Sequence, residues 1–182
     1  MTSESENMTV CWFAMRDLKR SNAKLPAWKL LESKGFEVFT PFKWRLRTLR
    51  NGTKRREKVP YMQDLLFVRS TRCELDPIVG KTPTLQYRFV FGSWCEPMIV
   101  RNADMERFIA AVSSSESALY YRPDEITPAM CGRSVRIVGG PLDGYEGKLL
   151  KIRGLRIKRL LIELPNLLTV GVEVNPEYVQ LL

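Results

Sequence analysis

Apolar and polar residues alternate over several short stretches of the chain, a pattern that predicts half-buried strands. In the clearest stretch, Val135 and Ile137 are apolar on one side and Arg136 lies on the other. A loop with several glycines follows at 139–147, and Lys148–Ile152 resumes as a strand. Because glycine lets the backbone turn without a clash at Cβ, this strand–loop–strand unit is typical of a small β-barrel.

Four further short runs also have the pattern of strands. The last part of the chain is therefore expected to form a five-stranded barrel. The predicted strands are Ser134–Val138, Gly147–Arg153, Leu160–Leu164, Thr169–Val174 and Val179–Leu181.

The N-terminal part alternates between strand and helix patterns. A dense aromatic and β-branched run predicts a buried first strand, and Pro26 and Gly35 bracket a helix from Leu25. A second good helix begins at Asn102 or Ala103. The expected order is strand Val10–Arg16, helix Leu25–Gly35, strand Phe36–Trp44, strand Leu65–Val68, a short helical stretch Cys73–Gly80 interrupted by Pro77, and strands Thr84–Phe91 and Met98–Val100.

This layout predicts an α+β protein, with a ferredoxin-like N-terminal domain joined to a small all-β barrel. The composition changes after the second helix, where serines and then prolines replace the periodic pattern. We therefore expect a disordered N-terminus at 1–8, a first domain at 9–112, a linker at 113–129 and the barrel at 130–182.

The chain is basic, with a net charge of +9 and a pI near 9.6. A net positive charge of this size favours a polyanionic partner such as nucleic acid. The alternative is that the charge only keeps the protein soluble. The charge is concentrated between Lys43 and Lys58, where Glu57 is the only acid. Asn51-Gly52 predicts a two-residue type I′ turn there, and hence a two-stranded cationic ribbon. A solvated hairpin without a function remains the alternative.

Several kinds of chemistry are excluded by what the sequence lacks. It contains no histidine, and its four cysteines are far apart, which removes the common zinc patterns and a Cys-His nucleophile. The glycine loop does not end in the G-K-[S/T] of a phosphate-binding loop. No apolar run is long enough to span a bilayer and no signal segment is evident. We expect a cytoplasmic protein that is not an enzyme and uses no cofactor or metal.

The glycine loop carries a resemblance. Its spacing resembles the KOW motif of NusG-type transcription factors and of some ribosomal proteins, although another small barrel with glycine corners would look similar. The residues that carry the KOW resemblance are Gly132, Val135, Arg136, Ile137, Gly140, Pro141, Gly144 and Gly147.

The N-terminal part resembles the NGN domain of the NusG family. Trp12–Arg16, Phe39–Pro41 and Leu66–Arg69 stand where that family has its W-Y/F-x-V/L, A/T-P and L-F-V elements. The spacing is most similar to the specialised UpxY-type and RfaH-like paralogues. One departure is Met62–Leu65, which replaces the family's F-P-G/N-Y and lacks its Pro-Gly turn.

This resemblance implies a transcription elongation or antitermination factor of long operons, such as those for capsular polysaccharide. Its N-terminal domain would bind the clamp helices of the largest RNA polymerase subunit through an apolar depression. We place Tyr61, Met62, Leu65 and Phe13 in that depression, with ordinary core as the alternative, which is favoured for Trp12.

The resemblance also implies contact with nucleic acid of the elongation complex, mainly DNA, while the barrel engages a ribosomal protein or a termination factor. We expect a monomer with no membrane partner. The cationic residues expected to meet phosphates are Arg16, Lys19, Arg20, Arg45, Arg47, Arg50, Lys54, Arg55 and Arg56.

Two alternatives stay open. A ribosome-associated RNA-binding protein would also contain a KOW barrel. In RfaH-like proteins the C-terminal domain can form a helical hairpin, but Gly154, Pro165, Gly171 and Pro176 oppose helix here and Val170, Val172 and Val174 favour strand. We therefore expect the barrel.

Overall fold

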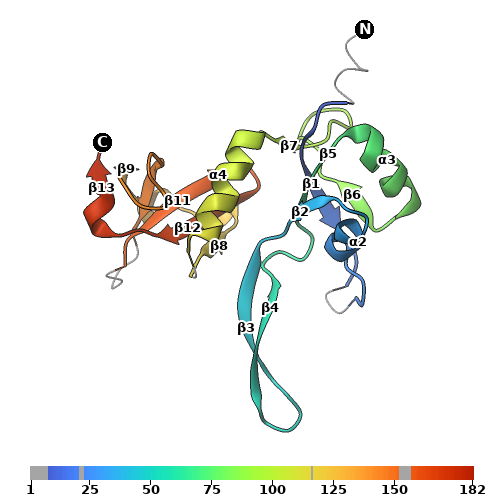
Figure 1. Ribbon diagram of the computed structural model, residues 1–182, viewed down its shortest axis with the longest axis horizontal. Coiled ribbons are helices and arrows are strands. Elements are labelled where there is room, and N and C mark those ends of the chain that lie inside the picture. The colour runs from blue at the N-terminus through green and yellow to red at the C-terminus, as the bar shows by residue number, and fades with distance from the viewer. Residues whose placement is uncertain (1–7, 21–22, 116, 152–156) are drawn as a thin grey trace. The chain divides into compact units, whose positions relative to one another are not determined.

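The computed structural model describes residues 8–20, 23–115, 117–151 and 157–182. The chain divides into two compact units, Met1–Asn102 and Ala103–Leu182. We describe each unit by itself (Figure 1). The expected disorder at 1–8 falls, except for the exposed Met8, outside the described residues.

The first unit is built on an antiparallel sheet. Strand β1 (Cys11–Asp17) pairs on one side with β5 (Leu66–Ser70) and on the other with β6 (Leu85–Tyr87) and β7 (Ile99–Val100). Strand β2 (Glu37–Phe39) pairs with the outer edge of β5, which gives the order β2-β5-β1-β6. This is the strand order of a ferredoxin-like fold, and it confirms the predicted class.

One face of this sheet forms the core with helices α2 (Ala27–Ser33) and α3 (Arg72–Lys81). Phe13 and Met15 from β1 pack there against Leu31 of α2 and Leu75 of α3. Asp17 at the end of β1 accepts hydrogen bonds from the backbone of Lys19 at 3.0 Å and of Ala27 at 2.6 Å. Its buried carboxylate therefore fixes the start of α2 against the sheet.

Two local predictions in this unit were wrong. Pro77 does not interrupt its helix, because α3 continues through it for 10 residues and begins with a capping box of Thr71 and Glu74. The predicted strand Thr84–Phe91 ends early: β6 stops at Tyr87, and only a single bridge joins Phe89 to Pro97.

The predicted strand Phe36–Trp44 is divided at Pro41 into β2 and β3 (Phe42–Thr48). Strand β3 pairs with β4 (Lys54–Pro60) as a separate two-stranded hairpin that projects from the sheet of its unit (Figure 1). Proline supplies no N–H to a ladder, so the chain leaves the sheet at this position.

The predicted type I′ turn of the hairpin was also wrong. The backbone N–H of Gly52 donates to the Leu49 carbonyl at 2.9 Å, and that of Leu49 donates to the Thr53 carbonyl at 2.8 Å. The loop therefore has three residues, and only Gly52 among them has a positive φ, of 79°. Type I′ needs positive φ at both central residues, whereas the three-residue loop needs it only at its last.

The second unit is an all-antiparallel sheet in the order β13-β9-β10-β11-β12-β8. The five predicted strands correspond to β9 (Cys131–Ile137), β10 (Glu146–Leu150), β11 (Arg159–Leu164), β12 (Leu168–Glu173) and β13 (Val179–Leu181). The predicted end of the second strand, at 152–153, lies outside the described residues. The expectation of strands rather than a helical hairpin is confirmed.

A sixth strand, β8 (Leu119–Tyr121), comes from the predicted linker and pairs with β12. The side chain of Tyr120, in the middle of β8, is buried. This burial explains why a segment without clear periodicity joins the sheet. Helix α4 (Asn102–Ser113) precedes it and buries Met105, Phe108 and Ala111. The sequence-based limits of 9–112 and 113–129 remain predictions. In the described part of the chain, no helix is long and apolar enough to cross a membrane.

Candidate nucleic-acid and partner-binding surfaces

The β3–β4 hairpin has two chemically different faces, because side chains alternate between the faces of paired strands. Trp44 lies opposite Lys58, and Leu46 lies opposite Arg56, so these residues share one face with Phe42, Thr48 and Lys54. We call this the Trp44 face. The other face carries the pairs Arg45–Glu57 and Arg47–Arg55 together with Lys43 and Val59, and we call it the Arg45 face.

Positive charge on the Arg45 face is partly neutralised by Glu57. Arg45 donates two hydrogen bonds to Glu57 Oε1, at 3.0 Å from Nε and 2.5 Å from Nη2, and Arg47 Nη1 lies 3.8 Å from Oε2. The hydrogen bond from Arg45 is the main reason that the pKa of Glu57 is lowered, which shows that the pair favours the ionised carboxylate. Arg55 on the same face has no carboxylate within ion-pair distance among the described residues.

The predicted phosphate-binding residues are brought together only in part. Arg45, Arg47, Arg50, Lys54, Arg55 and Arg56 all lie exposed on the hairpin. Arg16 instead lies near the end of β1, paired with Gln86, and Lys19 and Arg20 follow the strand. Lys19 Nζ donates to the Leu25 carbonyl at 2.8 Å, which occupies one of its donors. The prediction that these residues bind nucleic acid stays a prediction, and the structure divides it into two groups.

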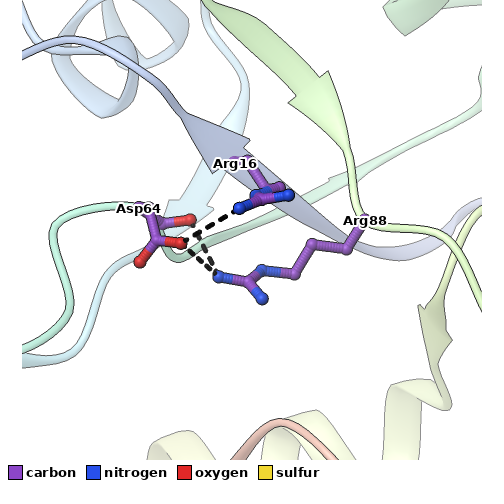
Figure 2. Close-up of polar contacts among 3 residues, drawn as sticks. All are labelled: Arg16, Asp64 and Arg88. Atoms are coloured by element: carbon purple, nitrogen blue, oxygen red, sulfur yellow. Dashed lines mark hydrogen bonds and ion pairs between the residues drawn. The ribbon is translucent and has the colours of Figure 1, made fainter.

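Figure 2 shows Arg16 and Arg88 converging on the carboxylate of Asp64. Arg88 Nη2 donates to Asp64 Oδ2 at 2.9 Å and to the Asp64 carbonyl at 3.2 Å, while Arg16 Nη2 lies 3.8 Å from Oδ2. Burial lowers the pKa of Arg88, and the charge of Asp64 opposes that shift. Two cations share one anion, so the cluster keeps positive charge beside the turn that contains Met62.

The residues expected in the apolar depression differ in accessibility. Phe13 and Leu65 are each 1% exposed and belong to the interior of the unit, whereas Tyr61 and Met62 are half-buried. The N–H of Tyr61 donates to the Pro41 carbonyl at 2.7 Å, and Lys43 Nζ lies 5.2 Å from the centre of its ring. Of these four residues, only Tyr61 and Met62 offer surface to a partner.

The strongest exposed apolar segment was missed by the sequence interpretation. Between β6 and β7, Phe89 and Val90 are exposed, Phe91 is fully exposed and Trp94 is 95% exposed. The run was interpreted as the end of a strand because apolar residues alternate up to Phe91. The Gly92-Ser93 pair and Pro97 were the available signals that the chain turns here instead.

The KOW glycines have two distinct structural roles. Gly140 and Gly144, with φ of 72° and 76°, form the loop between β9 and β10. Gly132 and Gly147 lie in strands, where a Cβ would stand 2.9 Å from the Leu149 carbonyl oxygen and 2.6 Å from that of Leu161. Val135 and Ile137 are buried and Arg136 pairs with Glu146, while Pro141 lies in the loop with its side chain exposed.

The second unit also contains an open cavity of about 750 Å³ lined by Asp104, Arg107, Glu146, Lys148 and Glu163 among others. In the described part of the chain, no group of histidine, cysteine or carboxylate residues could hold a metal ion.

A ferredoxin-like unit with a cationic hairpin, followed by an antiparallel β unit with a glycine-cornered loop, defines a two-domain protein suited to nucleic acid and to protein partners. Residues 10–109 match the family model described as "NusG: Transcription termination factor nusG". The chain belongs to the NusG family, whose members are non-enzymatic transcription elongation and termination factors and bind RNA polymerase.

A solved structure titled "Domain interaction in Thermotoga maritima NusG" is 16% identical, with a TM-score of 0.48, over 96% of this chain and 98% of that one. No curated protein gives a significant sequence match.

Proposed function

We propose that this protein is an antitermination factor of the UpxY type, acting in the cytoplasm on specific long operons such as those for capsular polysaccharide. Its N-terminal unit binds the polymerase clamp helices, its hairpin and the end of β1 contact nucleic acid, and it suppresses pausing or termination. The main support is the projecting hairpin, on which nearly all charged residues are cationic. Phosphates are the partners that such a ribbon attracts most strongly.

Polymerase binding is assigned to the half-buried Tyr61 and Met62 and to the exposed Phe89 and Phe91. The Asp64–Arg88 hydrogen bonds join the turn of Met62 to the residue that precedes the Phe89–Trp94 segment, so the two segments start next to each other. The centre of the Phe89 ring itself lies 6.5 Å from that of the Tyr87 ring. Phe13 and Leu65 support this surface from the interior. A few large apolar side chains carry most of the binding energy of a typical interface.

Nucleic-acid contact by Arg16, Lys19 and Arg20 and by the hairpin cations is assigned mainly to the DNA of the elongation complex. These charges position the protein on phosphates and carry little sequence information. The β unit is assigned to a second factor, either a ribosomal protein or a termination factor, and the protein acts as a monomer.

Retention on RNA polymerase and transcription through a terminator test this proposal together. Met62→Asp should abolish retention and terminator read-through while the circular dichroism spectrum stays unchanged, because it places a charge on a half-buried apolar surface. Met8→Asp is the matched control, since Met8 is exposed outside the sheet and should be tolerated.

Equal retention of the Met62→Asp variant would remove the assigned polymerase surface. Migration of the wild-type protein with ribosomal subunits rather than with polymerase would instead favour the ribosomal alternative.

A further inference from the structure

We propose that the Trp44 face of the hairpin binds unpaired nucleotides, with a base stacked on the Trp44 indole and phosphates of the same strand bound by Lys54 and Lys58. This inference rests on the proposed function, because it names the form of nucleic acid that the hairpin takes. The residues that carry it differ from the Arg45 face, where Glu57 reduces the positive charge.

Trp44 is an unusual residue for a hairpin that projects from its sheet. Its side chain is 52% exposed, and Leu46, two residues further along the same face, is 70% exposed. Neither belongs to the core of the unit. The guanidinium carbon of Arg56 lies 4.4 Å from the centre of the Trp44 ring, so the indole is held by a cation on the partner strand. An aromatic ring held in this way offers a flat apolar surface to solvent.

The charge on this face selects the ligand. Lys54, Arg56 and Lys58 project from successive same-face positions of β4, and no carboxylate in the described residues forms an ion pair with any of them. Lys58 Nζ lies 5.3 Å from the centre of the Phe42 ring, which orients a second cation beside an aromatic residue. A partner must therefore combine negative charge with a flat apolar group, and a nucleotide has both.

Geometry favours a single strand over a duplex. In a duplex the bases are stacked on one another, whereas an unpaired base can place its π-face on an aromatic side chain. Same-face positions along a strand are about 6.6 Å apart. Successive phosphates of an extended single strand have a comparable separation. Lys54 and Lys58 are two such steps apart, about 13 Å, so they can contact phosphates separated by two nucleotide steps, with Arg56 between them.

Fluorescence anisotropy of the full chain with a labelled oligo-dT strand, an oligo-U strand and a DNA duplex, all of one length, tests this inference. Trp44→Ala should weaken single-strand binding roughly 5- to 160-fold, the range for loss of one stacked base. Duplex binding should change little, and Trp44→Phe should keep most of the single-strand affinity. Tighter binding of either oligo-dT or oligo-U supports the proposal and identifies the strand.

Two controls separate stacking from charge. Trp94→Ala removes an equally large exposed indole outside the hairpin and should leave oligonucleotide binding unchanged. Lys58→Ala should reduce the salt dependence of single-strand binding by about 0.7 in the log–log slope, whereas Trp44→Ala should leave that slope unchanged.

Three results would overturn the inference: no effect of Trp44→Ala, an equal loss for duplex and single strand, or an equal effect of Trp94→Ala. Weaker retention of Trp44→Ala on polymerase free of nucleic acid, with unchanged oligonucleotide binding, would assign the face to a protein instead. The proposed function stands in each of these cases if the wild-type protein is still retained on polymerase and promotes read-through.

Discussion

Arg88 Nη2 lies 2.9 Å from the Oδ2 atom of Asp64 and 3.2 Å from its carbonyl oxygen. These two hydrogen bonds join the residue that follows β6 to the turn that precedes β5. They hold the Met62 turn beside the start of the exposed Phe89–Trp94 segment. The position of the assigned polymerase-binding surface therefore depends on one half-exposed carboxylate.

Replacing Asp64 by alanine is expected to destabilise the protein by about 1–2 kcal/mol, because it removes a charge-assisted hydrogen bond from the partly buried Arg88. The effect stays this small because the Asp64 carboxylate is half-exposed and screened by solvent. Urea denaturation measures this loss. Glu37→Ala is the control, since its pair with Arg69 at 3.1 Å is more exposed and should be worth less than about 1 kcal/mol. Equal losses for both variants would contradict the structural role of Asp64.

Gly147→Ala is expected to destabilise the second unit by about 1–3 kcal/mol, because the new Cβ would lie 2.6 Å from the backbone oxygen of Leu161. Gly80→Ala provides the matched control within helix α3. A Cβ there meets nothing within 4 Å, so this substitution should be neutral or stabilising by up to about 1 kcal/mol. Chemical denaturation of both variants tests the difference, and similar effects would refute the close approach.

Stability should fall in alkaline solution partly through Tyr87. Burial, together with a 2.7 Å hydrogen bond donated to Asp76, raises the pKa of this phenol above its ordinary value of 10.0. The folded state therefore keeps the proton more tightly than the unfolded state, and the resulting stability is present below pH 10 and decreases above it.

Tyr87→Phe should lose stability less steeply than the wild type as the pH rises above 10. The measurement is the urea midpoint of both proteins over an alkaline pH series. A constant difference between the two curves across that range would exclude this role for the Tyr87 phenol.

Phe91→Ala and Trp94→Ala should leave the thermal midpoint nearly unchanged, because both side chains are exposed and contribute little packing. Phe91→Ala should nevertheless weaken retention on RNA polymerase, since Phe91 belongs to the assigned apolar surface. A large fall in the midpoint would show that the segment packs against the protein, and unchanged retention would remove Phe91 from the interface.

Glu57→Gln should tighten nucleic-acid binding. The carboxylate neutralises part of the charge of Arg45 and Arg47, and the hydrogen bond from Arg45 lowers its pKa further below the neutral range. Its removal frees about one cation for phosphate, which should steepen the log–log salt slope by about 0.7–0.9. Anisotropy over a salt series measures this, with Glu37→Gln as a control outside the hairpin. Weaker binding of Glu57→Gln would show that the Arg45 face does not meet phosphates.

The sequence by itself determined the local elements and the family. Strand and helix periods predicted β1, α2, β5, α4 and five of the six strands that the structure describes in the second unit, because these elements bury residues at regular spacing. Glycine spacing and the W-F, T-P and L-F-V elements identified the NusG resemblance. The family match over residues 10–109 confirmed the family from the N-terminal elements. The basic ribbon was also visible, because charge is a property of composition.

Only the tertiary structure decided which side chains face each other. The hairpin loop has three residues, one more than the predicted turn. This extra residue sets the register that places Trp44 opposite Lys58 and Arg45 opposite Glu57. A two-residue turn would have shifted every pair and placed Trp44 opposite Val59. The burial of Phe13 and Leu65, the exposure of Phe91 and the addition of β8 likewise depend on contacts between distant segments, which local periodicity does not encode.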